Sequence, residues 1–409
     1  MAVKVAKQYL IKSMGILSLA ASMLAVSANE FSGEISLQGR YFKDEGASPE
    51  QNKKTDVALS IQPEYKHKWD SGHKKITFTP YYRWDQQDKE RTHADIRQLD
   101  FVGSLGEEGN WEVQAGISKT YWGVTESQHL VDIINQTDAL EGIDGEDKLG
   151  QPMFRVSRLA DNGSLDLIVL PYFRERSFAG SKGRFRAPLV VDSNATTFES
   201  AKKEKHIDYA LRWTETVDAL DIGVHMFNGT SRDPQLSPII KNGKPIALKA
   251  HYPQITQLGV DLQHTGESTI WKLELINRQF DDSKNQDYSA LVGGFEHTLP
   301  AFENGSEIGL ITEYHHDSRG EAVGVTFQND VFVGGRYTLN DEAGSQLLAG
   351  AFIDLDDKTK SFRAEASRRL GKGFKINLEG QTFMDVGNDN PLKVLEKDDF
   401  IQLELQKYF

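Results

Sequence analysis

Residues 401–409, IQLELQKYF, alternate apolar and polar side chains with a period of two. Ile401, Leu403 and Leu405 fall on one face of this stretch, and the polar residues between them fall on the other, which is the pattern of a β-strand with one apolar and one polar face. The same alternation recurs through the chain, whereas helical spacing is hard to find beyond residue 28. The sequence therefore predicts an all-β protein.

The alternating segments have a common length of about 10 to 13 residues, which suits tilted strands that cross a bilayer. Their number is about 18, with 16 to 18 as the range. An even number places both chain ends on the same side of a sheet of hairpin-connected strands. The predicted strands are 31–42, 54–68, 73–84, 93–106, 110–121, 152–160, 163–173, 204–215, 218–228, 253–265, 268–280, 287–299, 305–316, 325–339, 344–355, 359–370, 373–385 and 397–409.

The connections between these strands fall into two classes. Those after even-numbered strands are tight, glycine-containing turns, and those after odd-numbered strands are generally longer. Short turns at one end and long loops at the other are typical of an up-and-down transmembrane barrel. The tight turns are 70–72, 107–109, 161–163, 265–267, 340–344 and 371–373, and the longer loops are 43–53, 85–92, 122–151, 174–203, 229–252 and 386–396.

The first 28 residues differ from the rest of the chain. Lys4, Lys7 and Lys12 precede an apolar run, residues 16–26, and Ala28 closes a short stretch of small residues. This is the order of a cleaved secretory signal peptide, and the run is short for a membrane-spanning helix. We therefore predict a signal peptide over residues 1–28 and a single barrel domain over residues 29–409, with an N-terminal membrane anchor as the alternative.

Composition excludes several classes of protein. The 409 residues contain no cysteine, which removes disulfide frameworks, thiol nucleophiles and cysteine-ligated metal sites. The formal net charge of −13 argues against a nucleic-acid partner. A mean hydropathy of −0.50 fits a barrel in which half of each strand faces water and the loops are charged.

The chain ends in Phe409 on an alternating strand, and in this it resembles Gram-negative outer-membrane β-barrels of the porin type. Lys407 departs from that pattern, because an apolar or aromatic residue is usual there. The resemblance implies a place in the outer membrane and, as partners, membrane lipid, lipopolysaccharide, the barrel-assembly machinery and small solutes. It leaves a homotrimer open and implies no cofactor or metal. A soluble β-sandwich or propeller would explain neither the terminal phenylalanine nor the loop asymmetry.

The polar face of such a barrel lines its lumen, and charged residues recur on that face. Charges on so many strands need water or mutual pairing, because a dry unpaired charge is costly. We interpret them as lining a water-filled path, with cross-strand pairing as the alternative. The predicted pore-lining residues are Arg40, Arg83, Arg155, Arg212, Arg278, Arg336, Arg363, Glu274 and Glu365.

The third long connection, residues 122–151, is rich in acidic residues and has an apolar core, residues 130–134. In the porins that the chain resembles, the third loop folds into the lumen and faces arginines of the wall. That resemblance implies a constriction formed by Glu126, Asp132 and Asp138. The alternative is an outward acidic loop that binds divalent ions between lipopolysaccharides.

The fourth connection is basic instead. Its cations are predicted either to attract anionic solutes into the mouth or to hold lipopolysaccharide phosphates at the rim. These residues are Arg174, Arg176, Lys182, Arg184 and Arg186.

Enzyme motifs are missing from the sequence. There is no G-x-S-x-G and no H-E-x-x-H, and the most suggestive group is 315–317, His-His-Asp, with Asp281 and Asp282. We predict that the chain is not an enzyme but a channel for passive diffusion of small polar or charged solutes, including ions. The alternatives are a substrate-specific transporter or exporter with a lumenal binding site, and a plugged structural or receptor barrel.

Overall fold

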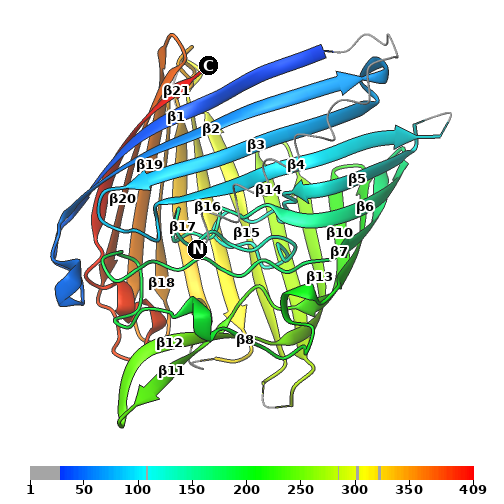
Figure 1. The fold of residues 1–409 in the computed structure, drawn as a ribbon. Helices are drawn as coiled ribbons and strands as arrows, with labels where there is room; N and C mark the ends of the chain where they lie inside the picture. Colours follow the sequence, from blue (N-terminus) through cyan, green and yellow to red (C-terminus); the bar gives the residue numbers. More distant parts are fainter. Residues whose placement is uncertain (1–27, 107–108, 284, 301–303, 321–323) are drawn as a thin grey trace.

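The computed structural model describes residues 28–106, 109–283, 285–300, 304–320 and 324–409. Eighteen of its strands form one antiparallel sheet that closes on itself. Closure occurs at β1 (Ala28–Phe42), which pairs with β2 (Thr55–Trp69) on one side and with β21 (Phe400–Tyr408) on the other (Figure 1). The predicted all-β barrel is confirmed. The predicted signal peptide lies outside the described residues, apart from Ala28.

Each of the predicted strands overlaps one strand of the barrel. No helix in the described part of the chain is long and apolar enough to cross a membrane. Short 3-10 turns are η1 (Pro49–Gln51), η2 (Asp70–Gly72), η3 (Ser193–Ala195), η4 (Lys203–Lys205) and η5 (Pro391–Leu395). The remaining barrel strands are β3 (Lys74–Asp85), β4 (His93–Leu105), β5 (Trp111–Ser118), β6 (Gln151–Ala160), β7 (Gly163–Leu170), β9 (Asp208–Val217), β10 (Leu220–Thr230), β13 (Gln254–Thr265), β14 (Thr269–Phe280), β15 (Tyr288–Pro300), β16 (Glu307–Asp317), β17 (Asn329–Thr338), β18 (Gln346–Asp354), β19 (Lys360–Gly371) and β20 (Phe374–Met384).

Burial along the strands is the reverse of that in a water-soluble protein. On β1 the polar residues Ser36 and Gln38 are 2 % and 6 % exposed, whereas the apolar residues Leu37 and Tyr41 are 51 % and 53 % exposed. The polar face therefore points into the barrel and the apolar face points out. A continuous apolar outer surface matches a hydrocarbon surrounding.

The barrel has two unlike ends, which we call the turn end and the loop end. Short connections such as 161–162 and 372–373 lie at the turn end, which is also the end at which the chain terminates (Figure 1). Long connections lie at the loop end, among them 119–150, 171–207 and 385–399. The predicted asymmetry of the connections is thus present in the fold.

A second, three-stranded sheet at the loop end was not predicted. Strands β11 (Gln235–Lys241) and β12 (Lys244–Tyr252) form a hairpin, and β8 (Thr197–Phe198) pairs with β12 in parallel (Figure 1). The turn of the hairpin is Asn242-Gly243, with positive φ at both residues. An Asn-Gly pair is a strong hairpin signal, here with Lys241 and Lys244 on either side and isoleucines beyond them, so the sequence did contain this information.

Candidate functional site

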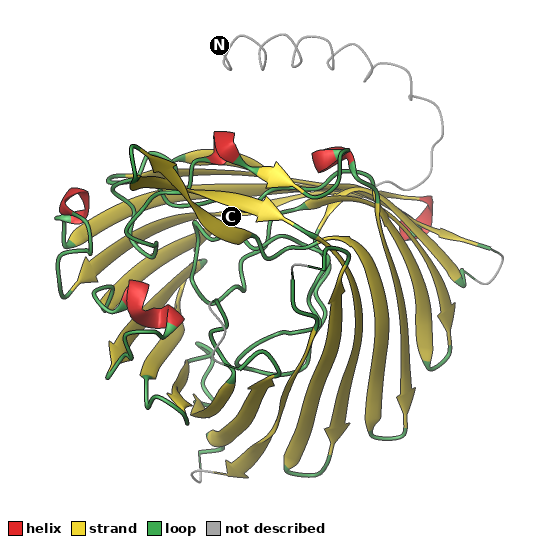
Figure 2. Ribbon diagram, turned by 90° about the horizontal axis from the view of Figure 1, so that it is seen from below, coloured by secondary structure: helices red, strands yellow, loops and turns green. Residues whose placement is uncertain are grey.

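Residues 119–150, which we call the inserted loop, lie inside the ring of strands (Figure 2). The first half of the loop packs on the inner wall through Trp122, Val131, Ile133 and Ile134, which are at most 5 % exposed. Complete burial of one such side chain contributes about 1.5 to 3 kcal/mol, so this contact fixes the loop firmly. The wall residues in the same apolar cluster are Met153, Ile168, Leu170, Ala210, Phe227, Ile255, Ile276, Tyr288 and Ala290.

Two buried carboxylates of the wall bind the backbone of the inserted loop. Oε1 of Glu274, on β14, accepts hydrogen bonds from the N–H groups of Val124 (2.7 Å) and Thr125 (3.1 Å), and its Oε2 accepts one from Val131 (3.2 Å). Glu313, on β16, accepts from the N–H of Glu126 at 2.7 Å. The loop backbone, which would otherwise be short of partners, is satisfied by the barrel wall.

His129 adds a charge to the Glu274 contact. Its Nε2 lies 2.9 Å from Glu146, and its Nδ1 lies 3.8 Å from Glu274. Burial alone would lower the pKa of His129, but hydrogen bonds and charge interactions with the two carboxylates outweigh this and raise it to about 10. The side chain is therefore an imidazolium at neutral pH and compensates part of the buried negative charge.

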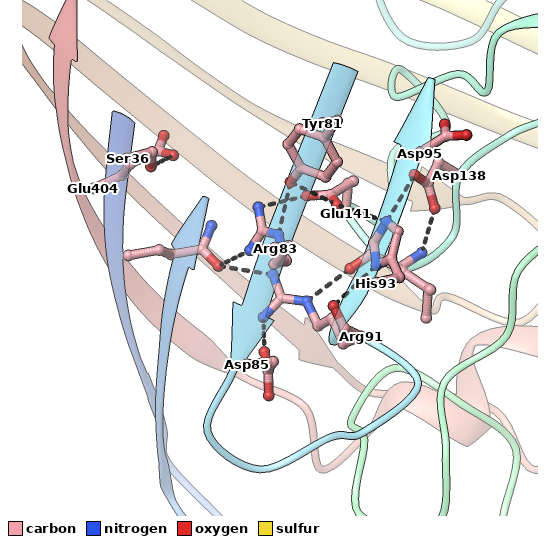
Figure 3. Close-up of polar contacts among 12 residues, drawn as sticks. Ser36, Tyr81, Arg83, Asp85, Arg91, His93, Asp95, Asp138, Glu141 and Glu404 are labelled. Carbon is pink, nitrogen blue, oxygen red and sulfur yellow. Dashed lines mark hydrogen bonds and ion pairs between the residues drawn. The ribbon is translucent and has the colours of Figure 1, made fainter. Parts of the chain in front are cut away.

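The second half of the inserted loop reaches the opposite wall. Arg97, on β4, binds Asp138 at 2.6 Å. Arg83, on β3, binds Glu141 at 2.5 Å (Figure 3). The hydroxyl of Tyr81 donates to Glu141 at 2.8 Å. These contacts are nearly dry, so removing either partner would leave a buried charge uncompensated.

The three predicted constriction residues occupy different places. Glu126 lies beside Arg336, at 2.7 Å, and contacts a lumenal cavity. Asp138 is fully buried against Arg97, and Asp132 is 8 % exposed and lies 3.2 Å from Lys148 of the same loop. Asp138 therefore ties the loop to the wall, Asp132 pairs within the loop, and Asp132 and Glu126 both line the larger cavity.

The inserted loop divides the lumen into two cavities of about 1610 Å³ and 270 Å³. The larger cavity extends from Arg319 and Leu392 at the loop end to Ser367 at the turn end. Its lining contains nine Lys and Arg side chains and nine Asp and Glu side chains, and the His129 imidazolium adds one positive charge, so the lining charges nearly balance. The smaller cavity lies against β1 to β4 and β19 to β21.

The tip of the inserted loop, residues 141–147, stands between the two cavities. Asp144 bridges from the tip to Arg363 on β19, at 2.7 Å, and both residues line both cavities. Asp144 was not among the predicted constriction residues. Its proximity to Arg363 depends on where the loop folds back, which the spacing of residues does not encode.

The predicted pore-lining residues separate into three groups. Arg278, Arg336 and Glu365 line the larger cavity, Arg40 and Arg83 line the smaller one, and Arg363 lines both. The remaining three point inward but line neither of the two cavities; Arg212 and Glu274 are buried, and Arg155 is partly exposed. Arg155 pairs with Glu112, Arg212 pairs with Asp261, and Glu274 binds the inserted loop.

The arginines of the basic fourth loop bind carboxylates and carbonyl groups of the protein itself. Arg174 binds Asp95 at 2.8 Å, Arg176 binds Asp233 at 3.0 Å and Arg184 binds Asp398 at 2.6 Å. Arg186 donates to backbone carbonyls of its own loop, and Lys182 is exposed. Most of this positive charge is therefore directed at the protein itself and ties the loop to β4, to the segment after β10 and to the segment before β21.

Two further histidines, His93 and His315, contact other groups of the protein. His93 Nε2 lies 4.0 Å from Asp138 and 3.8 Å from Glu141. These residue types are common metal ligands, but guanidinium groups already neutralise both carboxylates. His315 is fully buried, and its Nε2 contacts the Ser127 hydroxyl of the inserted loop at 2.8 Å. It therefore belongs to the loop contact rather than to an open site.

Asp147, at the loop tip, lines the smaller cavity, but it interacts with the charge of Asp144, which lines both cavities, so it is expected to make ion selectivity depend on pH. Burial in the lumen and the charges of Glu141 and Asp144 raise its pKa to about 6. Since the carboxyl loses its negative charge as the pH falls through 6, the reversal potential in a KCl gradient should shift toward anions between pH 7 and pH 5. The Asp147→Asn variant should show the low-pH value throughout.

The control is Asp341→Asn at the turn end, where hydrogen bonds from Ser345 hold the pKa of Asp341 below its usual range. This variant should respond to pH as the wild type does. An Asp147→Asn channel that still shifts between pH 7 and pH 5 would contradict the assignment.

Comparisons with solved structures show the same kind of fold. Wzi of Escherichia coli, described as an outer-membrane protein involved in group 1 capsule assembly and as a carbohydrate-binding β-barrel, aligns with 91% of this chain and 83% of its own at a TM-score of 0.51 and 8% identity. A triple mutant of the Rhodopseudomonas blastica porin aligns with 93% of this chain and 100% of its own at a TM-score of 0.44 and 12% identity. No family model and no curated protein sequence matches the chain. The expected resemblance to outer-membrane barrels is confirmed for the fold.

Proposed function

We propose that this chain is an outer-membrane channel through which small polar and charged solutes, ions included, diffuse passively along the larger cavity. The observation that carries the proposal is the extent of that cavity, whose lining includes Arg319 and Leu392 at the loop end and Ser367 at the turn end. The turn end would face the periplasm and the loop end the exterior. The apolar outer surface supports the placement in a membrane.

The lining of the larger cavity supports diffusion rather than chemistry. Arg336 and Lys272 face Glu126 and Glu296 across short distances, and Arg363 faces Glu365 at 2.6 Å. Paired charges along a wet path orient water and admit polar solutes without favouring one sign strongly. Ser127, in this lining, lies 2.8 Å from His315 Nε2, but its hydroxyl donates to Glu313, which also binds the backbone of the inserted loop. This geometry fits a loop contact, so we propose a non-enzymatic role.

Planar-bilayer recording of the refolded protein tests the proposal. We expect steady ohmic steps with weak ion selectivity, because the lining charges nearly balance. Ser367→Trp, which narrows the larger cavity, should lower the conductance, whereas Gln62→Trp in the smaller cavity should leave it nearly unchanged. A correctly folded, heat-modifiable barrel without conductance would contradict the proposal and favour a plugged receptor or structural barrel.

A second candidate is a channel with a substrate-binding site in the loop-end part of the larger cavity. The rings of Phe327 and Phe352 stack at 4.2 Å and line this cavity, and Phe332 lies 5.0 Å from Phe352. Aromatic faces of this kind bind apolar or ring-shaped solutes, and Wzi is described as binding carbohydrate. A glucan oligosaccharide that blocks the current would favour this candidate, and an unaffected current would favour simple diffusion.

A further inference from the structure

Arg40, on the inner face of β1, is a buried cation with an unusual surrounding. It is 7 % exposed, and no carboxylate oxygen of the described residues lies within 4.0 Å of its guanidinium. The other buried arginines of the described chain all form ion pairs at that cut-off. These are Arg83, Arg91, Arg97, Arg212, Arg232 and Arg278.

The carboxylates nearest to Arg40 are engaged elsewhere. Asp56, its partner in the β1–β2 register, binds Arg91 at 3.4 Å. Glu379 binds Arg363 at 3.1 Å and accepts a hydrogen bond from Gln402 at 3.1 Å. Neither carboxylate therefore compensates the charge of Arg40 directly.

Arg40 is held in place by neutral groups. Its Nε donates to the Gln402 side chain at 2.8 Å, and its Cζ lies 4.8 Å from the Phe185 ring and 5.1 Å from the Phe400 ring. The two rings contact each other, with centroids 5.2 Å apart. Cation–π contacts orient the guanidinium and exclude water, but they leave its charge uncompensated.

The guanidinium borders the smaller cavity, which has room for a small ion. Arg40 lines this space of about 270 Å³ together with Gln38, Ser60 and Arg83. Its terminal amino groups make no hydrogen bond to any described side chain or carbonyl. The acidic residues that also line the cavity are Glu34, Glu141, Asp144, Asp147, Glu379 and Glu404, of which Glu141, Asp144 and Glu379 are paired with arginines.

We propose that the smaller cavity is an anion-binding site that takes one small oxyanion against Arg40. Two free amino groups on a planar guanidinium match two oxygens of such an anion, and a charge-assisted pair of this kind is strong when water is excluded. Gln38 and Ser60 would supply further polar contacts. The site does not depend on conduction through the larger cavity.

Selenate is a suitable probe, because it is an oxyanion whose selenium can be located by anomalous scattering. The refolded full-length barrel is titrated with sodium selenate at constant ionic strength by calorimetry, and crystals soaked in selenate provide the position. We expect one selenate per chain, within hydrogen-bond distance of Arg40. Arg40→Gln should weaken binding by about tenfold or more, since it removes the positive charge and the paired amino groups of the guanidinium.

Arg155→Gln is the matched control, because Arg155 also points inward but is paired with Glu112 and lines neither cavity. It should bind selenate as the wild type does. Ser60→Trp fills the cavity without touching the charge of Arg40, and its loss of binding supports the site even if Arg40→Gln does not refold. Absence of binding at millimolar selenate, an anomalous peak elsewhere, or full binding by Ser60→Trp would each overturn the proposal. Bilayer conductance tests the channel separately.

Discussion

Excision of the inserted loop is expected to raise the single-channel conductance several-fold. Ser118 and Gln151 are direct partners in the β5–β6 ladder, so residues 121–148 can be replaced by a short Gly-Ser linker without altering the strands. A barrel of 18 strands is wide enough for an open aqueous lumen, and the loop is what divides this lumen into two cavities. Bilayer recording in KCl measures the change directly.

A matched control removes a comparable feature outside the lumen. Ser237 and Lys249 are partners in the β11–β12 hairpin, so residues 238–248 can be excised at the loop end. This deletion should leave the conductance close to that of the wild type. Equal conductance of the loop-excised and wild-type barrels would mean that the inserted loop does not limit the flow of ions.

The strands could be predicted because the geometry of a barrel imposes a local pattern on the sequence of each strand. A period of two and a regular length of about 10 residues follow from pleating and from the thickness of a bilayer. The Asn242-Gly243 turn is an equally local signal for a hairpin, but it lies within residues 229–252, which the spacing of the barrel strands predicts to be a long loop. Local geometry is therefore recoverable from one sequence when every segment is searched for it.

The candidate site was less predictable than the strands. The alternating pattern indicates which side chains point into the barrel, but it does not indicate which of them are covered by other parts of the protein. Glu274 and Arg363 both point into the barrel. Glu274 is buried under the inserted loop, whereas Arg363 lines both cavities. One signal of this covering was present. The run 167–170 is apolar on both faces, which indicates a strand that is covered inside as well as outside.

The sequence also did not predict which charged residues form ion pairs with one another. Asp138 and Asp144 belong to the same acidic loop, yet Asp138 is sealed against Arg97 and Asp144 spans the gap between the cavities. Which carboxylate meets which arginine depends on contacts between residues 41 and 219 positions apart, respectively, in the chain. A single sequence contains no local pattern for such contacts.

Glu274→Ala is expected to release the first half of the inserted loop. Three backbone N–H groups, from Val124, Thr125 and Val131, would lose their acceptor in a dry place, and His129 would lose one of its two carboxylates. Loss of one side of a buried charged contact costs about 3 to 5 kcal/mol. Limited proteolysis within residues 122–134 should become faster, and the recorded current should fluctuate to higher conductance.

Glu274→Gln separates hydrogen bonding from charge. Its carbonyl oxygen can still accept from Val124 and Thr125, so its effect should be smaller than that of Glu274→Ala. Glu112→Gln breaks the partly exposed pair with Arg155 and should cost about 1 kcal/mol or less, with no change in proteolysis of the loop. Similar losses in all three variants would contradict a specific anchoring role.

The loop-excised barrel gives the decisive comparison, because it lacks every group that Glu274 binds in the inserted loop. In that background Glu274→Ala should change neither the conductance nor the urea midpoint of unfolding, since the carboxylate then faces lumenal water. A large effect that persists there would assign Glu274 to the barrel wall itself. An effect confined to the intact chain would establish that Glu274 acts by holding the loop that divides the lumen.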